Sequence, residues 1–100
     1  MITLGVDPHP ASHTVVAIDE SGVSLGHLTA PNTVEGLTRL CEFSAQFTPH
    51  RWAIEGAGNH FICMFVDQLL SRGESVFSIS PSLTSQYRAR RRRKKNDMVD

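Results

Sequence analysis

Cysteine is scarce in this chain of 100 residues, which contains only Cys41 and Cys63. No Cys-x-x-Cys pair occurs, and this excludes a zinc ribbon or a zinc finger. Both cysteines fall inside apolar helical patterns, so we expect buried, reduced thiols. Long hydrophobic runs are also missing, since no apolar stretch approaches the roughly 18 residues of a membrane span, and the N-terminus lacks a signal-peptide pattern. The sequence therefore predicts a soluble, cytoplasmic protein.

Basic residues are nearly absent from the first 80 positions, although the formal net charge of the whole chain is zero. Residues 1–80 carry three basic groups against eight acidic ones, whereas residues 81–100 carry seven basic groups against two. A block of like charges repels itself and cannot help to build a core. Such a block can be a solvated tail, but this one runs directly into Asp97 and Asp100. We therefore expect it to contact nucleic-acid phosphates, through Arg88, Arg90, Arg91, Arg92, Arg93, Lys94 and Lys95.

Three strands are predicted at the start of the chain, over Ile2–Asp7, His13–Asp19 and Val23–Thr29. The second is apolar and β-branched in the way that a buried strand requires. The segment from Asp19 to Gly22 is typical of a hairpin turn, with glycine available for a positive φ.

Helices and strands alternate in the rest of the chain. Asn32 and Glu35 resemble a capping box that opens a helix, which Thr48-Pro49 ends. Short strands are predicted over Arg51–Glu55 and Ser75–Ser80, and Gly73 as the C-terminal cap of a helix between them. Ser82–Asp100 is expected to be helical in parts. The apolar helix positions are Val34, Leu37, Cys41, Ser44 and Phe47 in the first helix and Phe61, Ile62, Phe65, Val66, Leu69 and Leu70 in the second.

The order β-β-β-α-β-α-β-α predicts an α/β fold with a mixed five-stranded sheet. This is the order of ribonuclease-H-like (RuvC-like) nucleases. The first and fourth strands are then parallel neighbours, so their carboxyl ends bring Asp7 and Glu55 to the same edge. Trp52 and the phenylalanines are expected in the core, at positions Phe43, Phe47, Phe61, Phe65 and Phe77.

Four carboxylates form the candidate catalytic and metal-binding set: Asp7, Glu55, Asp97 and Asp100. The first two end apolar runs, and the last two are three residues apart, on one face of a helix. Carboxylates near a core require a partner, and hard oxygen ligands select Mg²⁺ or Mn²⁺. Two such ions, roughly 3.5–4 Å apart, can activate a nucleophile and stabilise the leaving oxygen of a phosphodiester.

Several segments resemble the N-terminal domain of the DEDD transposases of bacterial insertion sequences (the Piv/MooV-like family), which has a RuvC-like catalytic domain. They are Gly5-Val6-Asp7-Pro8-His9 with His13, Glu55-Gly-Ala-Gly58 and Lys95-Asn96-Asp97-Met-Val-Asp100. The resemblance covers the whole chain. It implies that Asp7, Glu55, Asp97 and Asp100 are the four catalytic acids of a DNA transposase. It also implies DNA partners at the element ends and the target, a structured guide RNA from the element, and a homo-oligomeric full-length protein.

Two departures from that family bear on activity. Pro10 stands where the family often has lysine, so a charge that faces phosphate is missing there. The family also has a C-terminal domain with a nucleophilic serine, whereas this chain stops at Asp100. We therefore expect a truncated domain that lacks transposition activity by itself, with slow metal-dependent nicking at most.

Each site residue also has a simpler interpretation. Asp7 can cap the turn that follows it, Glu55 can pair with Arg51 or His60, and the two final aspartates can neutralise the basic block. His13 is predicted as a strand residue near the site rather than a metal ligand. The other histidines, His9, His27, His50 and His60, show no metal-binding spacing.

Two other functions compete with the transposase. One is a non-catalytic nucleic-acid-binding module or an inactive transposase remnant, in which the basic block binds and the acids are incidental. The other is a lobe of an actin-like or sugar-kinase ATPase, which shares the early aspartate at a strand end. That class requires small residues just after the aspartate, whereas Pro8 and His9 stand here, so it ranks last.

Overall fold

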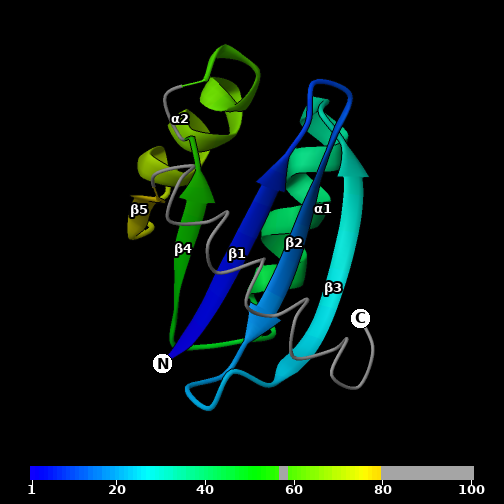
Figure 1. Cartoon of the computed structure of the whole chain (residues 1–100). Helices are drawn as coiled ribbons and strands as arrows, with labels where there is room; N and C mark the ends of the chain where they lie inside the picture. Colours follow the sequence, from blue (N-terminus) through cyan, green and yellow to red (C-terminus); the bar gives the residue numbers. More distant parts are fainter. Residues whose placement is uncertain (57–58, 80–100) are drawn as a thin grey trace.

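A single mixed sheet organises the protein, with the strand order β3-β2-β1-β4-β5 (Figure 1). The structure is a computed structural model that describes residues 1–56 and 59–79. Its order confirms the predicted α/β, ribonuclease-H-like arrangement through the fifth strand. The elements are β1 (Ile2–Pro8), β2 (Ser12–Ile18), β3 (Ser24–Pro31), α1 (Val34–Ser44), β4 (His50–Glu55), the 3₁₀ turn η1 (His60–Ile62), α2 (Cys63–Ser71) and β5 (Val76–Ile79).

The first three strands form the predicted antiparallel meander. The turn between β2 and β3 is built by Asp19, whose Oδ1 accepts hydrogen bonds from the backbone N–H groups of Ser21 and Val23, both at 2.9 Å. Gly22 adopts a φ of 86° in this turn, a conformation that glycine reaches without steric cost. The local sequence therefore specifies the hairpin as expected.

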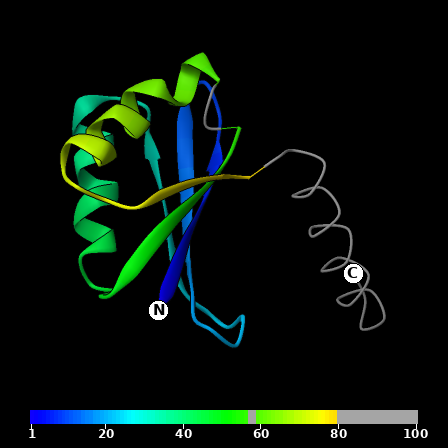
Figure 2. The same ribbon diagram turned by 90° about the vertical axis from the view of Figure 1, so that its left-hand side faces the viewer.

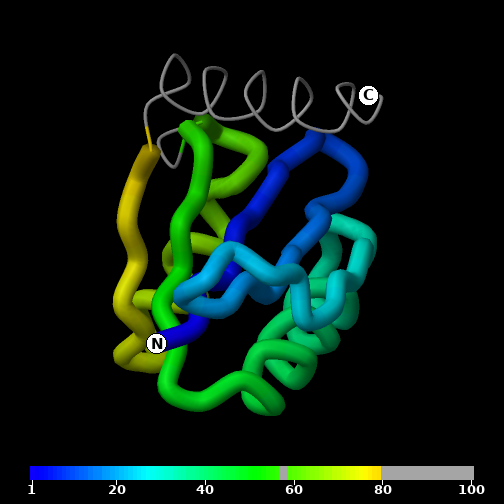
Figure 3. Tube along the Cα trace, turned by 60° about the horizontal axis from the view of Figure 1, so that its bottom comes forward, coloured from blue at the N-terminus to red at the C-terminus, as the bar shows by residue number. Residues whose placement is uncertain are grey.

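The last two strands extend the sheet in parallel on the other side of β1. Strand β4 pairs with β1 from Ile2↔His50 to Val6↔Ile54, and β5 pairs with β4. In Figure 3 the yellow β5 lies outside the green β4 at the edge of the molecule. Because β1 and β4 run the same way, their carboxyl ends lie at the same edge of the sheet.

Both described helices lie on one side of the sheet (Figure 2). The core between this side and the helices includes Trp52, whose ring meets Phe65 edge to face at a centroid distance of 5.4 Å. Alternate strand residues supply the sheet half of the core. The fully buried apolar side chains are Leu4, Val15, Ala17, Leu37, Leu40, Trp52, Ile54, Ile62, Phe65 and Leu69.

The start and end of α1 differ from the prediction. The N-cap is Thr33 and not Asn32, because the Thr33 side chain accepts the hydrogen bond from the Gly36 N–H at 3.1 Å. The Asn32 amide instead donates to the carbonyl of Phe61 at 2.9 Å. The helix ends at Ser44, earlier than expected, and a turn leads to the cis Thr48-Pro49 bond.

Four side chains predicted as buried are exposed: Cys63, Val34, Leu70 and Phe77. Cys63 and Leu70 lie on the outward side of α2, and Val34 is the first residue of α1. Phe77 lies on the edge strand β5, where the guanidinium carbon of Arg51 is 5.7 Å from its ring centroid. The predictions were wrong because an apolar stripe read from sequence does not show where a helix begins or which strand is at the edge.

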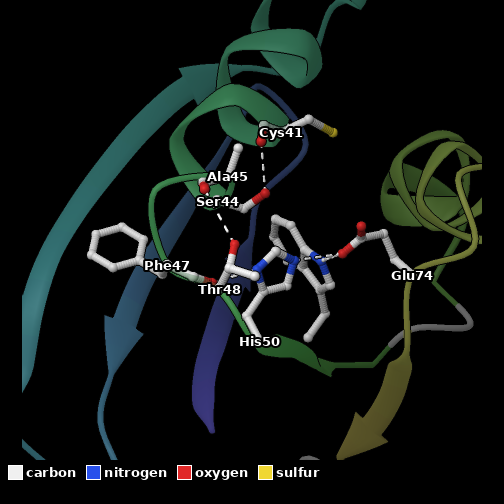
Figure 4. Close-up of polar contacts among 8 residues, drawn as sticks. Cys41, Ser44, Ala45, Phe47, Thr48, His50 and Glu74 are labelled. Carbon is white, nitrogen blue, oxygen red and sulfur yellow. Dashed lines mark hydrogen bonds and ion pairs between the residues drawn. The ribbon is translucent and has the colours of Figure 1, made fainter.

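A hydrogen-bonded cluster fastens the sheet at the amino end of β4 (Figure 4). His50 contacts the Phe47 carbonyl through Nδ1 at 2.6 Å and Glu74 Oε1 through Nε2 at 2.7 Å. The Trp52 indole N–H also donates to Glu74 Oε1, at 2.7 Å. His50 thus links the carbonyl of Phe47, after α1, to the side chain of Glu74, before β5. Burial alone would raise the pKa of Glu74, but the hydrogen bonds from Trp52 and His50 outweigh it and leave that pKa below 4.5.

We expect a Glu74→Gln substitution to lower the free energy of unfolding at pH 7 by about 1–2 kcal/mol, since charge-assisted hydrogen bonds are lost. The folded-state pKa of Glu74 is depressed, so its contribution is present above the unfolded-state pKa and is lost as the pH falls through the folded value. The difference between wild type and variant should therefore shrink below about pH 4.5. Urea unfolding of both proteins from pH 7 to pH 3 measures it. A difference that stays constant over this range would contradict the account.

Candidate metal site at the carboxyl ends of strands β1 and β4

Asp7 and Glu55 lie at the same edge and on the same face of the sheet. The register of β1 and β4 reaches Val6↔Ile54, so the next residue of each strand is one of the two acids. Val6 and Ile54 are buried on the helix side. Successive strand residues point to opposite faces, so Asp7 and Glu55 both point to the face away from α1 and α2. The register of β1 and β4 therefore places Asp7 beside Glu55, as the sequence predicts.

The surroundings of Asp7 are set by the short connection between β1 and β2. The Asp7 side chain is 55% exposed, and its Oδ2 lies 3.5 Å from His9 Nε2. The backbone N–H of His9 donates to the carbonyl of Ser12 at 3.0 Å, which closes the loop. Asp7 is thus reachable from solvent, and an imidazole that can carry positive charge lies beside it.

Glu55 is half-buried at the last position of β4, and a tight turn follows it. Gly56 has a φ of 63°, its N–H donates to the carbonyl of Ile79 at 3.3 Å, and its own carbonyl accepts from the Asn59 N–H at 2.9 Å. A Cβ at this position would lie 2.7 Å from Asn59 Nδ2. The positive φ and the close Asn59 side chain therefore require glycine at this position.

The other predicted site residues, Asp97, Asp100 and the basic residues Arg88 and Arg90–Lys95, lie outside the described residues. Over residues 1–56 and 59–79, no group of three or more His, Cys, Asp or Glu side chains is placed to hold a metal ion. The described part of the chain thus contributes two carboxylates to the candidate site.

His13, predicted as a strand residue near the site, lies on β2 beneath this edge. His13 is fully buried, and its ring stacks on Phe65 with centroids 5.9 Å apart and an interplanar angle of 8°. Burial lowers the pKa of His13, and the neighbouring Asn32 side chain opposes this to a smaller extent. The sequence signal for its burial was that His13 occupies a core-facing position of a strand whose other core-facing residues are apolar.

A comparison with known families matches nearly the whole chain. The family model DEDD_Tnp_IS110, described as a transposase, matches residues 4–100. No curated protein matches the chain. Among the described residues, no helix combines the length and the apolar character needed to cross a membrane.

Proposed function

The chain belongs to the IS110-type family of DEDD transposases, and on this premise we propose that it is the metal-dependent catalytic domain of an insertion-sequence transposase. Its reaction would be cleavage and exchange of DNA phosphodiester strands. The observation that carries the proposal is the parallel register of β1 and β4, which ends with Asp7 and Glu55 at one edge and on one face. In open α/β sheets, ligands favour the carboxyl ends of strands.

We propose that Asp7, Glu55, Asp97 and Asp100 are the catalytic residues and hold Mg²⁺ or Mn²⁺. The two described members fit such an ion, because both are carboxylates and Asp7 is open to solvent. When bound, divalent cations supply activation of an oxygen nucleophile and stabilise charge on the leaving oxygen. Strands β1 and β4 hold Asp7 and Glu55 at fixed positions, which limits the misplacement of these two carboxylates.

His9 has a defined place in this proposal. Its Nε2 lies 3.5 Å from Asp7 Oδ2, so the imidazole and a cation would compete for the same carboxylate. A cation held by Asp7 Oδ2 would therefore have to displace His9 from this contact.

For nucleic acid, we propose that Arg88 and Arg90–Lys95 contact phosphates. Such contacts carry little sequence preference and weaken steeply with salt. The residues run directly into Asp97 and Asp100, so the segment would bring a phosphodiester backbone toward the acids. The proposed partners are the DNA of the element ends and the target, a structured guide RNA, and further copies of the full-length protein, in the cytoplasm.

Nicking of supercoiled plasmid in Mg²⁺ or Mn²⁺ tests this function. We expect the chain to nick slowly, only with a divalent cation, and the nicking to disappear in Glu55→Gln. The matched control is Asp67→Asn, which neutralises an exposed carboxylate on α2 and should leave nicking unchanged. Nucleic-acid binding without cation-dependent nicking, or nicking that is equal in Glu55→Gln, would instead favour a non-catalytic binding module or an inactive remnant.

A further inference from the structure

We propose that His13, together with Asn32, is a positioning pair for the carboxylate edge of the sheet. The pair ties the β1–β2 loop, which follows Asp7, to η1, which follows Glu55 and its turn. The proposal rests on the proposed function and deepens it, because it names the side chains that fix the two carboxylates relative to each other. Neither residue would contact the metal or the DNA.

His13 lies on β2 opposite Pro8, the last residue of β1, and points to the helix side of the sheet. Asp7 pairs with the next residue, Thr14, and points to the other face. His13 is therefore directly behind the site and separated from it by the sheet. A fully buried imidazole is costly unless its nitrogens are hydrogen-bonded, so its partners indicate why a histidine is present.

The first partner links His13 to the loop after Asp7. The backbone N–H of His9 points at His13 Nδ1, at 3.3 Å, and at the carbonyl of Ser12. Nδ1 accepts this bond, so the neutral ring carries its proton on Nε2. The His9 side chain in turn lies beside Asp7. His13 thus holds the backbone of the residue that partners the first carboxylate.

The second partner is Asn32, in the connection between β3 and α1. His13 Nε2 and Asn32 Oδ1 are both buried, and neither has a hydrogen-bond partner among the described residues. The two atoms are a matched donor and acceptor, and His13 pairs across the sheet with Ala30, two residues before Asn32. We infer that His13 Nε2 and Asn32 Oδ1 are hydrogen-bond partners, with Nε2 as the donor.

Asn32 completes the connection to the other loop. Its Nδ2 donates to the carbonyl of Phe61 in η1 at 2.9 Å and lies 3.4 Å from the carbonyl of Pro10. Its backbone N–H donates to the carbonyl of Ala11 at 2.9 Å. One asparagine thus contacts both the segment after Asp7 and the segment after Glu55. Mutation of the residues that orient the ligands of a metal site commonly lowers the metal affinity about 10–100-fold.

Two substitutions at His13 separate positioning from simple core packing. His13→Phe keeps an aromatic ring against Phe65 but removes both nitrogens, whereas His13→Asn loses the ring and keeps an acceptor close to the Nδ1 position. We expect His13→Phe to have the higher unfolding temperature of the two but the weaker Mn²⁺ affinity, about 10–100-fold below wild type. Asn32→Leu should weaken Mn²⁺ binding in the same way if His13→Phe does not fold. His27→Phe is the matched control, since His27 is exposed on β3.

If the Mn²⁺ affinities of His13→Phe and His13→Asn rank in the same order as their unfolding temperatures, the proposal is overturned. A wild-type Mn²⁺ affinity in both His13→Phe and Asn32→Leu would also overturn it. Nuclear magnetic resonance of the metal-free chain decides it independently of metal binding. In His13→Phe and in Asn32→Leu, the amide signals of Asp7 and Phe61 should shift. In His13→Phe, the His9 amide hydrogen should also exchange faster with solvent. Unchanged Asp7 and Phe61 signals would refute positioning. Absence of Mn²⁺ binding in the wild-type chain would instead refute the proposed function and leave the metal-free result to decide on His13.

Discussion

A Gly36→Ala substitution is expected to destabilise the protein by about 3 kcal/mol or more, since overpacking against backbone has no easy relaxation. Gly36 is buried in the first turn of α1, where the helix passes close to the end of β3. A Cβ at this position would overlap the carbonyl oxygen of Pro31 and lie 2.9 and 3.0 Å from its carbonyl carbon and nitrogen. These are main-chain atoms, so the helix would have to move away from the sheet.

The change should lower the unfolding temperature by roughly 12–24 °C, as about 1 kcal/mol corresponds to 4–8 °C in a domain of this size. Gly5→Ala is the matched control, because a Cβ there would meet nothing closer than the carbonyl oxygen of Val16 at 4.0 Å. Thermal unfolding followed by circular dichroism compares the two. Equal unfolding temperatures for the two variants would show that α1 does not pack as described.

Removal of either described carboxylate is expected to weaken Mn²⁺ binding by at least about a hundredfold, more than substitutions behind the ligands of a metal site usually cost. Asp7→Asn and Glu55→Gln keep the shape of each side chain and remove its charge. Both acids lie near the carboxyl ends of neighbouring parallel strands and on the same face, so either loss leaves an incomplete set of oxygen ligands. Isothermal titration with Mn²⁺ measures the affinities.

The effects of Asp7→Asn and Glu55→Gln on Mn²⁺ affinity should also be coupled. The double substitution should weaken binding little beyond either single one, because residues that act at one site are not additive. Asp67→Asn, on the outer face of α2, should bind Mn²⁺ as the wild type does. Two independent and additive losses would place Asp7 and Glu55 at separate sites.

The strand order was predictable because each segment carries its own signals. Alternating apolar residues, the Asp19 turn and the glycine after α2 each specify local structure, and three antiparallel strands followed by crossovers leave few topologies. The juxtaposition of Asp7 and Glu55 followed from that topology alone. It needed no knowledge of side-chain contacts, since it depends only on which strands are parallel neighbours.

Other features depend on contacts between distant segments and could not be predicted. Asn32 was expected to cap α1, but it bonds to Phe61, 29 positions later in the chain. Thr33 takes the capping role because a hydroxyl one residue later serves the Gly36 N–H equally well. The contact of His13 Nδ1 with the backbone N–H of His9 became visible only when the fold brought β2 against the loop after Asp7. The contributions of Asp97 and Asp100 stay predictions, since they lie outside the described residues.

Paramagnetic broadening by Mn²⁺ tests most directly whether the strand ends form one cation site. In a ¹⁵N-labelled chain, trace Mn²⁺ should broaden the amide signals of Asp7 and Glu55 at the same concentration, together with those of Asp97 and Asp100. Excess Mg²⁺ should restore them. Signals of Asp7 and Glu55 that stay sharp while exposed acids such as Asp67 broaden would contradict the account.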